Sequence, residues 1–83
     1  MTVGEAIRTI RLAKRIRQQE LARRVGCKQG YISQIERNSR EPSLQLFRDI
    51  ANALGVPPYV LLALATETRR EVEDGERRTA VAR

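Results

Sequence analysis

The chain has 83 residues and a net charge of +6, from sixteen Lys and Arg against ten Asp and Glu. This length allows one small domain with a modest core, so oligomerisation is expected. With one cysteine and no histidine, the sequence predicts no intramolecular disulfide, no zinc site, no cofactor and no histidine base, and we expect a protein that is not an enzyme.

The positive charge lies in residues 1–65, which hold eleven Lys and Arg against five Asp and Glu, whereas residues 66–83 hold five of each. We expect a basic domain over the first segment, and a helix extension with a flexible tail over the second. A compact basic domain favours nucleic acid first and an anionic membrane second, although a basic surface also serves solubility. No signal peptide is evident and the longest apolar run, residues 59–65, is too short to span a bilayer, so a cytoplasmic location is expected.

The first predicted helix begins with a capping box at residues 2–5 and continues to about Arg15. The second is predicted over Gln18–Val25, because Gly26 suits the left-handed position that ends a helix. The expected inward face of the first helix consists of Val3, Ile7, Ile10 and Ala13.

A third helix is predicted over Lys28–Arg37 and a fourth over Leu44–Leu54, with Ser43 as the N-cap of the fourth. A fifth helix is predicted to open at Pro58 and to run toward residues 74–75. The expected inward face of the fourth helix consists of Leu44, Phe47, Ile50, Ala51 and Leu54. No strand pattern appears, so the sequence predicts an all-α fold of five short helices.

The second and third helices meet the local demands of a helix-turn-helix. That motif needs a small residue where its helices approach, a glycine in the turn, and apolar residues facing inward. These demands are met by Leu21, Ala22, Val25, Gly26, Ile32 and Ile35. The residues left facing outward are Lys28, Gln29, Gly30, Ser33 and Gln34. Glutamine can bond to adenine and lysine to guanine in the major groove, although such residues also occur on ordinary solvated surfaces.

In these segments the sequence resembles the phage repressor and Cro family of helix-turn-helix DNA-binding domains, also called the Xre family. The matching segments, in order, are residues 7–14, 18–26, 31–36, 41–43 and 50–56. The resemblance implies a compact five-helix, lambda-repressor-like domain with the motif at helices two and three. It also implies a homodimeric transcriptional regulator, a repressor, that binds a palindromic operator in double-stranded DNA.

The resemblance assigns roles to individual residues. It implies base reading by Lys28, Gln29, Gly30, Ser33 and Gln34. It implies phosphate contacts by Arg17, Gln18, Tyr31, Arg37, Asn38, Ser39 and Arg40, although Tyr31 is also suited to packing over the turn. Arg11 and Glu36 match a partly buried ion pair that orients the recognition helix. The dimer interface is expected at Pro57, Tyr59, Leu62 and Leu64.

Three residues depart from the family pattern. Arg17 and Lys28 stand where Ser, Thr or Asn normally caps helices two and three, and each change costs about 1 kcal/mol of capping. Arg15 replaces a common glycine after the first helix.

Cys27 is expected to be a small buried hydrophobe. Arg23 and Arg24 are interpreted as a solvated face that does not bind DNA.

Two other functions fit the resemblance. One is a restriction–modification controller protein, which activates or represses according to the occupancy of its sites. The other is an antitoxin whose segment 66–83 binds a toxin protein. The sequence does not specify the operator, the regulated genes, the sign of regulation or an effector.

Overall fold

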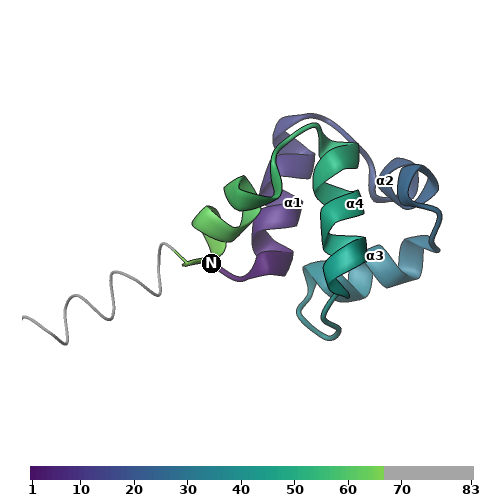
Figure 1. Cartoon of the computed structure of the whole chain (residues 1–83). Helices are drawn as coiled ribbons and strands as arrows, with labels where there is room; N and C mark the ends of the chain where they lie inside the picture. Colours follow the sequence, from purple (N-terminus) through teal and green to yellow (C-terminus); the bar gives the residue numbers. More distant parts are fainter. Residues whose placement is uncertain (67–83) are drawn as a thin grey trace, which may run out of the picture.

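The computed structural model describes residues 1–66. Its helices are α1 (Val3–Ala13), α2 (Gln18–Val25), α3 (Gln29–Glu36) and α4 (Leu44–Leu54), followed by a helical segment, Pro58–Thr66, that we call the last helix (Figure 1). The predicted all-α, five-helix fold is confirmed, and the described residues contain no strand. The predicted continuation of the last helix and the predicted tail lie outside the described residues.

Most helix ends lie where local chemistry predicts them. The Thr2 hydroxyl accepts a hydrogen bond from the Glu5 amide at 3.1 Å, and Ser43 caps α4 in the same way, also at 3.1 Å. Gly26 ends α2 at φ 75° and Gly55 ends α4 at φ 73°, a conformation that side chains disfavour. The predicted bounds of α2 and α4 are therefore confirmed.

The end of α1 differs from the prediction, because α1 stops at Ala13 and not near Arg15. Arg15 itself adopts φ 57°, in the left-handed region. The following Ile16 amide donates to the Arg11 carbonyl oxygen at 3.0 Å, which closes the helix as a glycine-ended turn would. Arg15 thus adopts the left-handed conformation of the glycine that is common here in the family, at a cost of about 1 kcal/mol.

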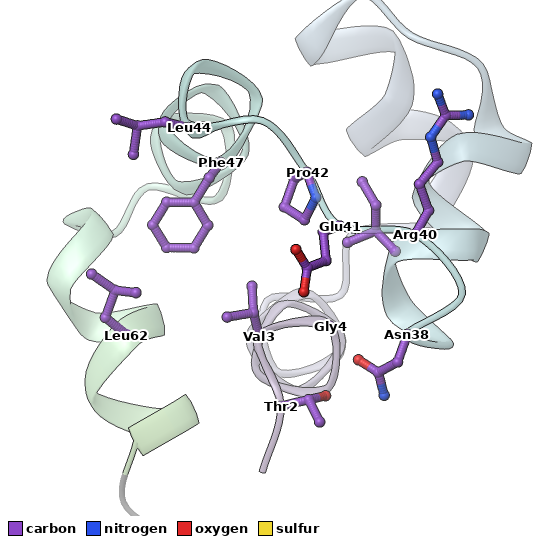
Figure 2. Close-up of a pocket in the computed structure, with 11 residues that line it drawn as sticks. Thr2, Val3, Gly4, Asn38, Arg40, Glu41, Pro42, Leu44, Phe47 and Leu62 are labelled. Atoms are coloured by element: carbon purple, nitrogen blue, oxygen red, sulfur yellow. The ribbon is translucent and has the colours of Figure 1, made fainter.

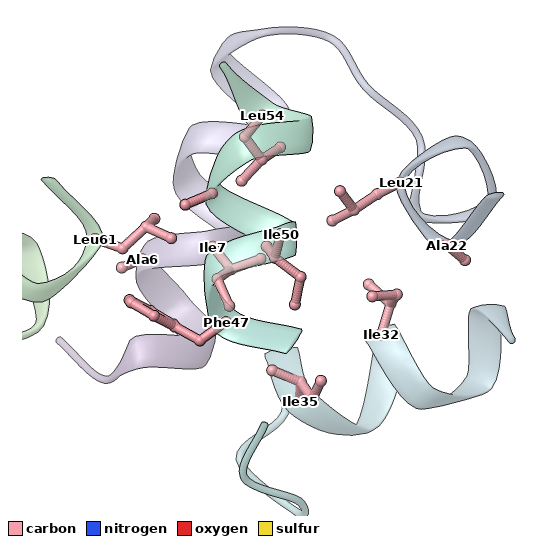
Figure 3. Packing of buried hydrophobic residues seen from close by; sticks show 11 residues of the cluster. Ala6, Ile7, Leu21, Ala22, Ile32, Ile35, Phe47, Ile50, Leu54 and Leu61 are labelled. Atoms are coloured by element: carbon pink, nitrogen blue, oxygen red, sulfur yellow. The ribbon is translucent and has the colours of Figure 1, made fainter. Parts of the chain in front are cut away.

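The hydrophobic core lies where the helices converge, with α4 packed against α1 and α2, and α3 packed against the same two helices (Figure 3). Its buried members are Ala6, Ile7, Leu21, Ala22, Ile32, Ile35, Phe47, Ile50, Ala51, Leu54 and Leu61. Two predicted inward residues are exposed. Leu44 is 65% exposed because it is the first residue of α4, beyond the part that other helices cover, and Ala13 is exposed at the last turn of α1.

Within residues 1–66, no single helix is long and apolar enough to cross a membrane. Taken together, α4 and the last helix reach that length and composition, but they are bent by 105° at the break between them. One face of α4 also belongs to the domain core, through Phe47, Ile50, Ala51 and Leu54.

Candidate nucleic-acid interface

A short turn joins α2 to α3 and fixes the angle between them. Gly26 takes the left-handed conformation, and the next amide, that of Cys27, donates to the Ala22 carbonyl oxygen at 3.0 Å. Ala22 is buried, as the close approach of the two helices requires, and Ile32 and Ile35 of α3 point into the core (Figure 3). The predicted inward side of the motif is therefore present, with Val25 half-buried at its edge.

The opposite side of α3 carries the polar residues predicted to face outward. Lys28, Gln29, Gly30 and Gln34 are exposed, and Ser33 is half-buried. No residue lies close to the Cα of Gly30 in the direction a side chain would take, so the helix surface is open there. The structure thus brings all five predicted base-reading residues together on α3 and its N-cap.

A buried polar network ties α3 to α1 and α2. Arg11 Nε donates to Glu36 Oε2 at 2.7 Å, and Arg11 Nη2 donates to Glu36 Oε1 at 2.9 Å. Gln18 Nε2 donates to the same Oε1 at 3.0 Å, and Arg11 Nη1 donates to the Ile16 carbonyl oxygen at 2.9 Å. The pair is more deeply buried than the partly buried bridge expected. The Glu36 carboxylate therefore links α1, α2 and α3, and this linkage fixes the orientation of α3 relative to the other two helices.

The starts of α2 and α3 lack side-chain caps. Arg17 and Lys28 occupy the cap positions in extended conformations, and neither side chain makes a capping hydrogen bond. The first amides of both helices therefore keep hydrogen-bonding capacity, which suits an anion at a helix start. Both side chains are exposed and add a positive charge at these ends.

The loop after α3 contains the other residues predicted to contact phosphate. Arg37, Asn38, Ser39 and Arg40 are all exposed, and Asn38 adopts φ 63°. The Ser39 hydroxyl donates to the Gln34 carbonyl oxygen at 3.1 Å and so closes the end of α3. Figure 2 shows Asn38 beside the start of α1 and Arg40 extending in another direction, so these two side chains diverge.

Ion pairing separates two groups of cations. Glu20 binds Arg23 at 2.6 Å and Arg24 at 3.1 Å, and these hydrogen bonds lower the pKa of Glu20 to about 2. Arg24 also donates to the Ala53 carbonyl oxygen at 3.0 Å. Among residues 1–66, by contrast, no carboxylate pairs with the cations around α3, which are Arg17, Lys28, Arg37 and Arg40. Arg8, Lys14, Arg15 and Arg48 likewise have no carboxylate partner among these residues, so the cations around α3 are part of a larger set whose charge is available.

These features are those of a known family. A family model for helix-turn-helix domains matches residues 7–61. The chain belongs to the phage repressor and Cro family of helix-turn-helix proteins.

Individual members of this helix-turn-helix family are similar over most of the chain. The immunity repressor protein of Bacillus phage phi105 is 32% identical over 71 residues, which are 86% of this chain and 49% of the repressor. The control protein C.BamHI of Bacillus amyloliquefaciens is 42% identical over 64 residues, 76% of this chain and 79% of that protein. The chain thus spans about half the length of the phage repressor and most of the control protein.

Solved structures of helix-turn-helix proteins share the fold. The P22 c2 repressor in complex with a synthetic operator superimposes with a TM-score of 0.69 at 36% identity, covering 74% of this chain and 92% of that one. That repressor was solved in complex with operator DNA.

The residues predicted for a dimer interface lie on the last helix and just before it. Tyr59 is 70% exposed and Leu62 is 49% exposed, and Pro57 is exposed as well. Leu64 is half-buried and packs against the core, so it has less surface to offer than predicted. Tyr59 and Leu62 are the larger apolar surfaces of this group.

Sequence reasoning missed a groove that this helix-turn-helix domain forms beside Leu62. It has a volume of about 610 Å³ and lies between the start of α1, the loop after α3, the start of α4 and the last helix (Figure 2). Exposed Leu44 faces it together with Val3, Phe47 and Leu62. Helical spacing had predicted that Leu44 lies in the core, so no sequence signal indicated an exposed apolar surface here.

Cys27 and Tyr31 both lie at the edge of the core. Cys27 is only half-buried and is therefore less enclosed than expected, and its partial burial raises the pKa of its thiol. Tyr31 is half-buried against the core, as one of its two predicted roles requires. Among residues 1–66, no group of three or more Cys, Asp or Glu side chains is arranged to hold a metal ion.

Proposed function

We propose that this protein is a sequence-specific regulator of transcription that binds double-stranded DNA as a homodimer and represses by competing with polymerase. The observation that carries this proposal is the outward face of α3, where exposed amides stand among cations without carboxylate partners. Membership of the helix-turn-helix family and the similarity to two phage repressors support it.

The base-reading role is assigned to α3. Gln29 and Gln34 each offer a donor and an acceptor, the pair that adenine N6 and N7 require. Lys28 can donate to guanine O6 and N7, and the half-buried Ser33 can bond to either base at shorter reach. Gly30 leaves room for the helix to approach the base edges. The Arg11–Glu36 pair maintains the angle at which these groups enter the groove.

The phosphate contacts are assigned to the two ends of the motif. At the start of α2, Arg17 supplies charge, and Gln18 supplies its backbone amide and the second N–H of Nε2, since the first binds Glu36. The remaining phosphate contacts are assigned to Arg37, Asn38, Ser39 and Arg40, whereas Tyr31 is assigned the packing role, the second of its two predicted roles. Contacts of this kind fix the register of the domain on DNA without reading sequence.

Dimerisation is assigned to Pro57, Tyr59, Leu62 and Leu64. A twofold dimer presents two copies of α3, so the operator should be a palindrome with half-sites about one helical turn apart. Exposed apolar side chains on one short helix are consistent with such an interface.

A controller protein of a restriction–modification system is a second candidate. The similarity to C.BamHI extends over 79% of that protein, and the solved controller protein C.AhdI of Aeromonas hydrophila superimposes with a TM-score of 0.69 at 34% identity, covering 71% of this chain and 89% of that one. A neighbouring methyltransferase and endonuclease gene pair would favour this role. The toxin-binding segment of the antitoxin hypothesis, residues 66–83, lies almost wholly outside the described residues, and we do not propose that function.

Selection of bound duplexes from a random pool tests the proposal. We expect enrichment of one palindromic sequence with half-sites about 10 base pairs apart. A pool that stays random after several rounds, although the protein is folded and retains duplexes, would limit it to nonspecific binding and contradict the proposal.

A further inference from the structure

The Arg40 guanidinium lies over the ring of Tyr31, with 4.4 Å between its carbon and the ring centroid. This separation is well within the range of a cation–π contact. Tyr31 is half-buried and packs against the core, so its ring is a fixed platform. Arg40 is exposed, and it comes from the loop that follows α3. The contact therefore holds arginine, a long side chain with many rotamers, against a rigid part of the motif.

The contact with Tyr31 leaves the N–H donors of the guanidinium available. A cation–π contact is made by the charge of the group over the ring, and it needs none of the five N–H bonds as a hydrogen-bond donor. Among residues 1–66, Arg40 has no ion pair and no side-chain hydrogen bond. In Figure 2 its side chain extends away from the neighbouring Glu41 carboxylate. Arg40 is thus held in place while its donors remain uncommitted.

The stack lies beside the face assigned to base reading. Tyr31 is two residues after Gln29, which at about 3.6 residues per turn places the two on roughly opposite flanks of α3. Gln34, three residues after Tyr31, lies on the neighbouring part of the helix surface. The charge of Arg40 is therefore fixed along one border of the outward face, where a DNA backbone would pass.

We propose that Tyr31 is a positioning residue, whose ring holds Arg40 ready to bind a phosphate before DNA arrives. The proposal rests on the proposed DNA-binding function. A free arginine loses much rotamer freedom when a ligand immobilises it, and prior ordering by Tyr31 removes part of that loss. Direct contact of the Tyr31 hydroxyl with phosphate is the competing explanation.

Three variants separate the two explanations. Tyr31→Phe keeps the ring and removes the hydroxyl, whereas Tyr31→Leu and Tyr31→Met keep apolar packing and remove the ring. In the free protein, the Arg40 side-chain protons should show ring-current shifts in the wild type and in Tyr31→Phe. The shifts should vanish in the other two variants. Unchanged Arg40 shifts in both apolar variants would overturn the stack.

Binding to the selected duplex, measured against salt concentration, tests the consequence. Arg40→Gln should reduce the slope of log affinity against log salt by about one unit, because one phosphate contact is lost. Tyr31→Phe should bind like the wild type, and the apolar variants should bind roughly two- to fivefold more weakly. In the Arg40→Gln background, the apolar substitutions should have no further effect.

Two results would overturn the positioning role while leaving DNA binding intact. Equal losses in Tyr31→Phe and Tyr31→Leu would assign the contact to the hydroxyl. An equal loss from Tyr31→Leu with and without Arg40→Gln would show that the two residues act independently. Urea unfolding of each variant identifies any loss that comes from misfolding. Absence of DNA binding by the wild-type chain would overturn the proposed function and this inference together.

Discussion

Arg11 and Glu36 form a two-point ion pair between α1 and α3, with side chains only 8% and 1% exposed. Burial removes the hydration of both charges, so such a pair commonly stabilises no better than an apolar pair of similar volume. It imposes a geometry that apolar contacts do not. We therefore attribute its value to the orientation of α3, with stability a minor part.

Substitutions at this pair should separate stability from function. Glu36→Ala leaves the Arg11 charge buried without its partner and should lower the free energy of unfolding by about 3–5 kcal/mol. The double variant Arg11→Met/Glu36→Leu should recover most of that loss in urea unfolding, yet bind the selected duplex more weakly than the wild type. Full recovery of specific affinity by the double variant would refute the orienting role.

Gly4 and Gly30 should respond oppositely to alanine. A Cβ at Gly4 would overlap the Ile35 carbonyl oxygen, which belongs to the backbone and does not yield, so Gly4→Ala should lower the free energy of unfolding by about 1–3 kcal/mol. Gly30 has open space, so Gly30→Ala should raise it by about 0.5–1 kcal/mol.

Gly30→Ala should also weaken the binding of specific DNA. The added methyl group enters the space between α3 and the base edges, so the stabilised Gly30→Ala variant should lose about 1–3 kcal/mol of specific affinity. Competition binding with the selected duplex measures this. Wild-type affinity in Gly30→Ala would show that α3 does not approach DNA closely at that residue.

Leu62→Glu should make the protein monomeric at micromolar concentration, because it places a charge in the proposed apolar interface. Leu12→Glu is the matched control, since Leu12 is 54% exposed and Leu62 49% exposed, and Leu12 lies on α1. Sedimentation should show a dimer for the wild type and the control. Dimers persisting in Leu62→Glu would place the interface elsewhere.

The Glu20 cluster predicts an acid-sensitive part of stability. Hydrogen bonds from Arg23 and Arg24 lower the pKa of Glu20 from 4.5 to about 2, so folding favours its ionised form. The resulting stabilisation is complete above pH 4.5 and is lost as the pH falls toward 2. Glu20→Gln should therefore have a smaller dependence of unfolding midpoint on pH across this window. Parallel curves for the variant and the wild type would contradict the shift.

Local signals carried most of the fold prediction. Thr2 and Ser43 are caps whose chemistry is complete within four residues, and Gly26 and Gly55 end helices by their own conformational freedom. The prediction that Leu44 faces inward was wrong, because spacing alone does not show which part of a helix is covered by other elements. Arg15 shows that a non-glycine residue can keep a turn when the surrounding hydrogen bonds require it.

The site depends more on contacts between distant segments. The outward set on α3 could be predicted, since the inward isoleucines leave only one other face. The bond from Gln18 to Glu36, the stack of Arg40 on Tyr31 and the close approach of Gly4 to Ile35 join residues far apart in sequence or on different elements. No periodicity encodes these contacts, so they required the three-dimensional arrangement.

The central claim is that the exposed side chains of α3 read DNA bases, and Gln29→Ala tests it most directly. Affinities of the wild type and the variant are measured for the selected duplex, for each of its single-base-pair variants, and for a random duplex, with the exposed Gln45→Ala on α4 as control. We predict that Gln29→Ala loses about 1–3 kcal/mol of discrimination at one base pair of each half-site, with random-duplex affinity unchanged. Equal losses on the selected and random duplexes would contradict base reading by α3.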